Sequence, residues 1–222
     1  FFKQKTAYEI YQCDWSSDVC SSDLALSDSV RALARRGELR AYRRGSVLIH
    51  EGDIGDTLYV ILSGRLRVFS SNPDSGKEVT FGTYGPGEYV GEMGLDGGPR
   101  SASVVALEAT QCAMVVRPRL EAHLAEHPQF AFELLAKVIR RARDATLSAK
   151  HMALNDVYGR IKLLLESMEP CASEAAGVCL GRVTQREIAA RVGCTPTMVG
   201  RVVKDLERGG YLHWQQIGRA HV

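Results

Sequence analysis

The sequence lacks the features that mark several large classes of protein. None of its six cysteines forms a C-x-x-C pair, and no cluster of cysteine and histidine has the spacing of zinc ligands. It has no apolar run of about 18 residues, the length that a membrane-spanning helix requires. It shows no nucleophile–base set, so the chain is not expected to be an enzyme. The net charge of only +2 gives no global sign of a nucleic-acid partner.

The composition is nevertheless that of a folded globular protein. Hydrophobic residues make up 45% of the 222 residues and charged residues 24%, which is enough apolar material for real cores. The cysteines are scattered and no convincing signal peptide is present, so we expect a reducing, cytoplasmic environment. We expect no metal and no covalently attached cofactor.

Both ends of the chain differ from the rest. Residues 1–24 show no sustained helical or strand period and resemble translated sequencing-adapter read-through. Residues 217–222 resemble the same kind of scar. We therefore expect both segments, with Cys13 and Cys20, to be non-native and leave them out of functional reasoning.

Short β-rich runs separated by glycine and proline fill the chain from Arg40 to Arg117. Strands at this spacing predict an antiparallel sandwich or barrel, for which a jelly roll is the natural closed form. We assign residues 25–127 to this domain. Its expected strands include Val47–Ile49, Leu58–Leu62, Leu66–Phe69, Val79–Phe81, Val104–Val105 and Cys112–Val116.

The hydrophobic period then changes to that of helices. A short helix is expected over Pro118–Glu126, and a long one follows from Pro128, with no glycine or proline before Leu154. We assign residues 128–155 to a dimerisation helix, because its apolar stripe is long and narrow. The alternative is a helix that lies on its own β-domain. The stripe consists of Ala131, Leu134, Leu135, Val138, Ala142, Ala145, Ala149 and Met152.

Residues 156–216 are predicted to form a helical DNA-binding domain. Asn155–Asp156 is expected to cap a helix that runs through Met168, and Glu169–Gly177 has the composition of a linker. Thr184 and Glu187 then form a capping box, which begins a further helix.

A tight turn at Gly193 separates that helix from a second one, which Thr195 caps and Pro196 begins. Gly209–Gly210 ends the second helix, and Tyr211 begins the strand of a wing that is cut short at about Gln215. This arrangement predicts a helix-turn-helix. Its expected inner face consists of Ile188, Ala189, Val192, Val199, Val202, Val203 and Leu206.

The second helix of such a unit enters a major groove with its N-terminal residues. Arg201 is the expected base reader, because its guanidinium matches O6 and N7 of guanine. The segment 181–212 carries six basic and three acidic residues, although a solvated surface would explain the charge equally well. Phosphate contacts are expected from Thr184, Gln185 and Lys204. The remaining DNA-facing residues are Thr195, Pro196, Thr197 and Gly200.

The loop GEMGLDGGPRSA, residues 91–102, indicates an anion site in the β-domain. A cyclic phosphodiester requires backbone N–H groups and a cation, and its ribose 2′-hydroxyl requires an acceptor. Glycines, Arg100 and Glu92 supply these three elements. A plain β-turn with a surface salt bridge is the alternative.

Both motifs together resemble those of the cyclic-AMP receptor/FNR (Crp/Fnr) family of bacterial transcription regulators. The resemblance covers about Leu33 to Gln215, and the string VTQREIAARVGCTPTMVGRVVKDLERGGYL resembles the family's DNA-binding signature throughout. It implies an α+β fold with a β-roll, a long dimerisation helix and a C-terminal winged helix-turn-helix. Residues implied in cyclic-nucleotide binding are Gly91, Glu92, Met93, Arg100 and Ser101, with Thr146 on the long helix.

The implied protein is a homodimer that binds an operator in double-stranded DNA and contacts RNA polymerase. Its effector, with cyclic AMP as the expected one, shifts a hinge near Asn155–Asp156. The loop between Glu92 and Arg100 is shorter than in the best-known cyclic-AMP binders. Pro196 and Thr197 stand where the catabolite activator has charged base readers.

Two alternatives stay open. One is a regulator of the same architecture that senses another signal or is active without a ligand. Iron–sulfur sensing requires clustered cysteines, which Cys112, Cys171, Cys179 and Cys194 do not form, and the candidate haem ligands His50, His123, His127 and His151 are expected on the surface. The other is a cyclic-nucleotide module of an enzyme or channel, which the helix-turn-helix disfavours.

Overall fold

The computed structural model describes residues 26–75, 77–168 and 183–211. The chain folds into two compact units. The first contains residues 26–70 and 80–142, and the second contains residues 71–79 and 143–211 with the two gaps named above. The two terminal segments expected to be non-native, the linker at 169–177 and the wing from residue 212 onwards lie outside the described residues.

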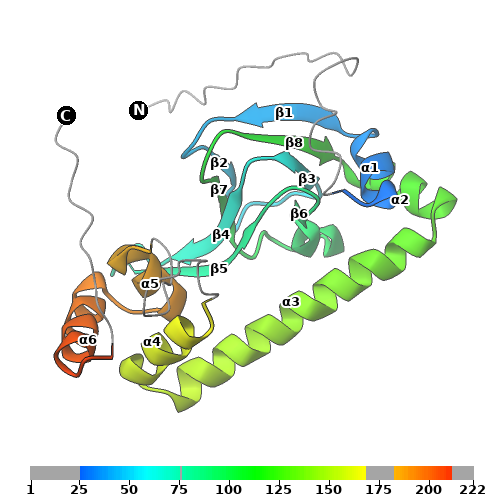
Figure 1. Cartoon of the computed structure of the whole chain (residues 1–222). Coiled ribbons are helices and arrows are strands. Elements are labelled where there is room, and N and C mark those ends of the chain that lie inside the picture. Colours follow the sequence, from blue (N-terminus) through cyan, green and yellow to red (C-terminus); the bar gives the residue numbers. More distant parts are fainter. Residues whose placement is uncertain (1–25, 76, 169–182, 212–222) are drawn as a thin grey trace, which may run out of the picture. The chain divides into compact units, whose positions relative to one another are not determined.

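Two four-stranded sheets form the body of the first unit (Figure 1). One has the order β1 (Glu38–Tyr42), β8 (Thr110–Val115), β3 (Leu58–Ser63) and β6 (Tyr89–Val90). The other has the order β2 (Val47–Ile49), β7 (Ser103–Ala106), β4 (Leu66–Ser71) and β5 (Glu78–Tyr84). Strands β1–β8, β8–β3, β3–β6, β2–β7 and β7–β4 pair antiparallel, as expected for a β-roll.

The side chains of β3, one of the two inner strands of its sheet, are buried on both faces of the sheet. Leu58, Val60 and Leu62 are buried in one cluster together with helical residues, whereas Ile61 is buried in a second cluster with residues of both sheets. Successive side chains of a strand point to opposite faces, so a strand covered on both faces is almost continuously apolar. The sequence LYVILS of β3 has that character.

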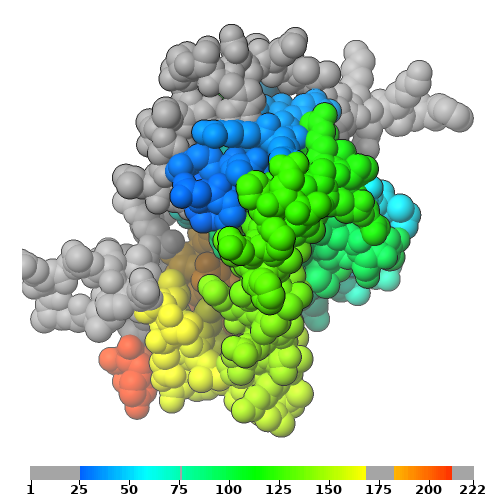
Figure 2. Space-filling view, turned by 90° about the vertical axis from the view of Figure 1, so that its right-hand side faces the viewer, coloured from blue at the N-terminus to red at the C-terminus, as the bar shows by residue number. Residues whose placement is uncertain are grey.

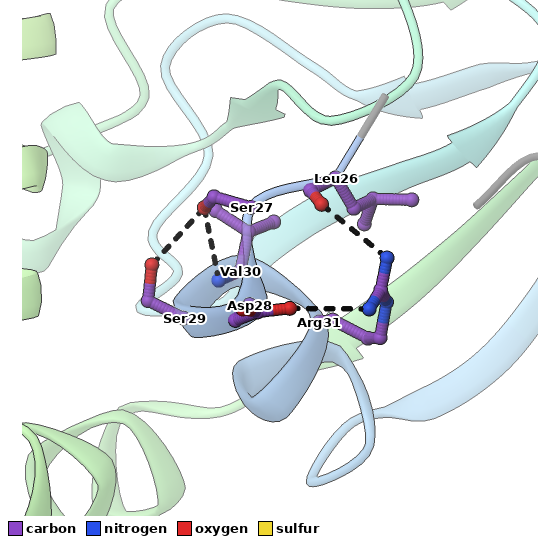
Figure 3. A network of polar contacts seen from close by, with 6 residues as sticks. All are labelled: Leu26, Ser27, Asp28, Ser29, Val30 and Arg31. Atoms are coloured by element: carbon purple, nitrogen blue, oxygen red, sulfur yellow. Dashed lines mark hydrogen bonds and ion pairs between the residues drawn. The ribbon is translucent and has the colours of Figure 1, made fainter. Parts of the chain in front are cut away.

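A short helix that sequence reasoning missed, α1 (Asp28–Ala34), packs Val30 and Leu33 into the first of these clusters. Figure 3 shows its N-terminus, where the Ser27 hydroxyl accepts from the Val30 amide and Arg31 pairs with Asp28 at 3.2 Å. Seven residues are too few for a clear hydrophobic period, so tertiary packing stabilises this helix more than its own sequence does.

Helix α2 (Arg117–Glu126) contradicts one expectation about the histidines. His123 is fully buried, not on the surface, because it shares the inner face of α2 with Leu120. Its ring meets Phe130 edge-on, with the ring centroids 5.2 Å apart. Neither ring nitrogen has a hydrogen-bond partner in the described part of the chain.

The long helix is α3 (Gln129–Leu154), which contributes Gln129–Ala142 to the first unit and Arg143–Leu154 to the second. The structure divides its apolar residues between two faces. Leu134 packs against the core of the β-roll, whereas Phe132, Leu135 and Ile139 are exposed. The alternative of a helix that lies on its own domain therefore holds for one side of α3, whereas a dimer seam on the exposed side stays a prediction. In Figure 2 the part of α3 that belongs to the first unit, drawn in green, lies on the surface that faces the viewer.

Three further helices form the second unit: α4 (Val157–Glu166), α5 (Gln185–Val192) and α6 (Pro196–Arg208). Asp156 caps α4 as expected, by accepting from the Gly159 amide at 2.7 Å, and α4 ends at Glu166, two residues before the predicted end. The core between the helices consists of Ile161, Ile188, Ala189, Val192, Cys194, Val199 and Val203.

Candidate functional site

Arg100 lies at the centre of the glycine-rich loop, and its side chain is held in one orientation. Its Nη1 donates to the carbonyl oxygen of Gly91 at 2.7 Å, and its Nη2 donates to that of Thr57 at 2.9 Å. The residue is only 7% exposed. Among the described residues its side-chain partners are neutral carbonyl groups and not a carboxylate, so this position favours an anion.

Three glycines make room for this guanidinium. Gly91 has φ = +93°, and a Cβ there would lie 2.6 Å from the Thr57 oxygen and 2.9 Å from Nη1 of Arg100. A Cβ on Gly94 would lie 2.4 Å from the Gly55 oxygen, and one on Gly55 would lie 3.0 Å from Nη2 of Arg100. Glycine is therefore required at 91 by both conformation and space, and at 94 by space.

Glu92 begins the 3₁₀ helix η2 (Glu92–Asp96), and its carboxylate is already paired. Nη1 of Arg141, on α3, lies 2.6 Å from its Oε1. The Glu92 side chain is 7% exposed and that of Arg141 is 20% exposed, so both charges are largely removed from water. The pair joins the glycine-rich loop to α3 within the first unit.

Arg141 is also held by two tyrosines. Its Nη2 donates to the Tyr89 carbonyl at 2.6 Å, and its guanidinium carbon lies 4.3 Å from the centroid of the Tyr84 ring. Burial lowers the pKa of Arg141, but Glu92 and the two tyrosines outweigh that effect and raise the pKa above its ordinary value. One helical turn earlier, Nζ of Lys137 donates to the Gly87 carbonyl and stacks on Tyr89.

The structure brings together only part of the predicted effector site. Gly91, Glu92 and Arg100 lie close together, whereas Met93 is 55% exposed and Ser101 is exposed. Thr146 belongs to the second unit, so its role stays a prediction. Sequence reasoning missed Arg141 and Gly55, and it included Gly94 only as one of the glycines of the loop. A signal for Arg141 was its place four residues after Lys137, on the same side of α3.

The second candidate surface is built on α5 and α6. The Thr184 hydroxyl accepts from the Glu187 amide at 3.2 Å, and Oε2 of Glu187 accepts from the Thr184 amide at 2.7 Å, which confirms the capping box. Gly193, with φ = +69°, ends α5, and Thr195 caps α6. The structure thus has the two short helices and the tight turn expected from the sequence.

The faces of these helices also agree with the prediction. The predicted core residues Ile188, Ala189, Val192, Val199, Val203 and Leu206 are all buried, and Val202 is half-buried. On the opposite face of α6 the predicted DNA contacts Pro196, Thr197, Arg201 and Lys204 are exposed, and Gly200 is half-exposed. This exposed surface carries two cations, Arg201 and Lys204, which lie about one helical turn apart. Neither forms an ion pair with another residue that the structure describes.

Two of the three threonines predicted to contact DNA, Thr184 and Thr195, use their hydroxyl groups inside the protein. The Thr184 hydroxyl donates to Oε2 of Glu187 at 2.9 Å, and the Thr195 hydroxyl accepts from the Met198 amide. Their first role is therefore to begin α5 and α6 at the correct residues.

Alternative sensing chemistries find little support in the described residues. Cys112 and Cys194 are free and buried, and burial raises the pKa of the Cys112 thiol to about 12, which disfavours the reactive thiolate. No group of three metal-ligating side chains occurs in that part of the chain. No described helix has the length and apolarity needed to cross a membrane.

Comparison with known proteins decides the family. The family model of the cyclic nucleotide-binding domain matches residues 39–127. The chain is 34% identical over 194 residues to the cyclic AMP receptor protein of Thermus thermophilus, a match that covers 85% of this chain and 82% of that protein. The chain belongs to the cyclic-AMP receptor/FNR family of transcription regulators.

Other members of this family are similar over most of their length. The cAMP-activated global transcriptional regulator CRP of Haemophilus influenzae is 32% identical over 179 residues, which cover 79% of this chain and 80% of that protein. The structure of the c-di-GMP responsive global regulator CLP of Xanthomonas campestris has a TM-score of 0.76 at 27% identity and covers 85% of this chain; the match spans 95% of that chain. These relatives are named as transcription regulators and not as enzymes, as expected for this chain.

Proposed function

We propose that the chain is a homodimeric DNA-binding regulator whose β-roll binds a cyclic nucleotide at Arg100 and Glu92. The observation that carries this proposal is the orientation of Arg100: a buried guanidinium, fixed by two carbonyl groups and surrounded by three glycines. That combination of a fixed cation and close backbone is what a phosphodiester requires.

Arg100 has donors left for a phosphate. A guanidinium carries five N–H groups, and the contacts with Gly91 and Thr57 use two of them. The other three are not engaged by a described residue, and a cyclic phosphodiester offers them two exocyclic oxygens, one axial and one equatorial. The fixed orientation lowers the entropic cost of binding, because the side chain does not need to be ordered by the ligand.

Glu92 is the proposed acceptor for the ribose 2′-hydroxyl. Its Oε1 is bound by Arg141, and among the described residues no partner is found for Oε2. A ribose hydroxyl therefore reaches Oε2 while the ion pair persists, or it displaces Arg141 and frees the side chain on α3. Either way, ligand binding at Glu92 acts on α3, which gives the effector a route to the dimerisation helix.

Isothermal titration calorimetry with cyclic AMP, cyclic GMP and c-di-GMP tests the effector. We expect cyclic AMP to bind, Arg100→Lys to lose most of the affinity because lysine lacks the planar fork, and Arg117→Ala to bind normally. Arg117 is the matched control because it is an exposed arginine of the same unit. Unchanged affinity in Arg100→Lys would reject the pocket. Binding of c-di-GMP alone would replace the proposed effector.

The homodimer rests on the exposed face of α3. Phe132, Leu135 and Ile139 are 76%, 57% and 45% exposed and follow helical spacing, which is a costly arrangement for a helix that has no partner. A second copy of the same helix would cover them by two-fold pairing. Sedimentation velocity should show a dimer that Leu135→Glu dissociates and Gln129→Glu, at the exposed start of α3, does not. A monomeric wild-type protein would reject the pairing.

Two α6 helices related by this pairing would enter successive major grooves, with half-sites about 34–36 Å apart. Selection from random double-stranded DNA, with and without cyclic AMP, tests this directly. We expect enrichment of two inverted half-sites centred one helical turn apart, and enrichment only with ligand. Recovery of unrelated sequences in both conditions would reject sequence-specific binding. Contact with RNA polymerase and a cytoplasmic location stay predictions.

One observation favours a second candidate, a regulator of the same architecture that is active without a ligand. The Glu92–Arg141 pair already neutralises the carboxylate that a ribose would bind. If this candidate is correct, the selection experiment returns the same operator with and without cyclic AMP, and calorimetry shows no cyclic-nucleotide binding.

A further inference from the structure

We infer that Gln185 and Gly200 form a coupled pair. Because Gly200 has no side chain, the Gln185 amide has room to lie on the surface of α6 that is proposed to face DNA. The inference rests on the proposed DNA binding and extends it. Gln185 was expected to contact a phosphate, but nothing in the sequence connected it with Gly200, which lies on the other helix of the motif.

The geometry of the contact is specific. A Cβ placed on Gly200 would lie 3.2 Å from Oε1 of Gln185, 3.7 Å from its Cδ and 3.7 Å from its Nε2. The nearest of the three atoms is the oxygen, so the Gln185 amide lies beside the position that a side chain at residue 200 would occupy. Any side chain at residue 200 would begin in the space next to this amide.

Both residues are held firmly on the protein side. Gln185 is the first residue of α5, directly after Thr184, and the capping box of Thr184 and Glu187 fixes the backbone there. Gly200 has ordinary helical backbone in the middle of α6. Its position therefore does not require glycine for conformation, and helix propensity alone would favour alanine by about 1 kcal/mol. The close approach of Gln185 supplies a reason for glycine.

The location of the amide indicates its role. Residues three and four positions from Gly200 share its side of the helix, which places Thr197 and Lys204 beside it. Both are exposed and belong to the surface proposed to face DNA. Gln185 is therefore a positioned neutral hydrogen-bonding group between these two residues. We assign it to a phosphate oxygen of the operator, because it reaches this surface from α5 and not from the helix that enters the groove.

A double-mutant cycle tests the coupling in the full chain, with the operator obtained by selection as probe. Gly200→Ala should weaken operator binding by about three- to tenfold, the range that one neutral hydrogen bond contributes. In the Gln185→Ala background the same change should have no further effect. Because Gln185 is assigned to a phosphate and not to a base, its loss should be equal across operator variants. Because its amide is neutral, the loss should leave the salt dependence unchanged, whereas Lys204→Ala should lower the salt slope by about one unit.

Two further measurements distinguish a Gly200→Ala variant that fails to fold from one that is folded but has a displaced Gln185 amide. Gly200→Ala should raise the melting temperature, because alanine stabilises α6, and should shift the NMR signals of the Gln185 side-chain amide. Thr197→Ala, one turn earlier on α6, should leave those signals in place. Additive effects in the cycle, or unchanged amide signals in Gly200→Ala, would overturn the pairing while DNA binding persists. A wild-type chain that binds no DNA would overturn the proposed function as well.

Discussion

Glu92 and Arg141 are far apart in the sequence but form a 2.6 Å ion pair that joins the start of η2 to the middle of α3. The same arginine donates to the Tyr89 carbonyl and stacks on Tyr84. The loop that carries the proposed phosphate site is thus tied to the helix proposed to form the dimer. This connection gives a physical route from effector to dimer that lies wholly within the first unit.

Replacing Arg141 alone should destabilise the protein more than replacing Glu92 and Arg141 together. Arg141→Leu leaves the Glu92 carboxylate buried without its partner, and we expect unfolding free energy to fall by about 3 kcal/mol. The double variant Glu92→Gln with Arg141→Leu should recover much of that loss. Urea unfolding measures both, and Arg140→Leu, an exposed neighbour, is the control. Equal stability of the single and double variants would show that the carboxylate is not the cause.

Gly91 should be much less replaceable than Gly45, although both have positive φ, +93° and +84°. A Cβ on Gly45 meets no atom within 4 Å, so Gly45→Ala should cost only about 1 kcal/mol of backbone strain. Gly91→Ala adds collisions with the Thr57 carbonyl and the Arg100 guanidinium, and should cost about 2–4 kcal/mol. Unfolding midpoints compare the two variants, and similar costs would contradict the tight fit around Arg100.

His123 should make the first unit sensitive to acid. Its pKa is lowered from the ordinary 6.5, chiefly by burial and further by His127 and Arg36, while Glu126 opposes them. Below pH 6.5 the imidazole of His123 binds a proton more readily in the unfolded chain than in the folded protein. The free energy of unfolding is therefore highest above pH 6.5, and it decreases as the pH falls from 6.5 through the lowered pKa of the folded protein.

Urea unfolding at about pH 5 and about pH 7.5 measures this dependence. His123→Leu should lose less stability between the two values than wild type does. The matched control is His50→Gln, which changes an exposed histidine of the same unit and leaves both His123 and its neighbour His127 in place. An identical pH dependence in wild type and His123→Leu would show that another group is responsible.

Arg201 should contribute to sequence preference and not only to affinity. Arg201→Ala is expected to cost about 1–3 kcal/mol at one operator position, as for a guanidinium that binds guanine. Binding measured across operators with a single base changed at each position checks this. A uniform loss over all operators would instead identify a phosphate contact.

The sequence predicted the second unit well because its signals are local. A helix cap, its Glu187 partner and the glycine turn at Gly193 act over a few residues, and the apolar residues of α5 and α6 follow the helical period. The strands of the β-roll were also predicted, although β1, β6 and α1 were missed. A two-residue strand such as β6 and a seven-residue helix such as α1 have too few residues to show a period.

By itself the sequence determined the fold class, the helix-turn-helix and the identity of Arg100 and Glu92 as candidate ligands, because each follows from residue type and short spacing. Only the tertiary structure decided which side chains meet: Arg141 at Glu92, three glycines around Arg100, Gln185 over Gly200, and His123 inside the core. Such contacts join residues from different elements, and their distances depend on how those elements pack, which no local pattern encodes.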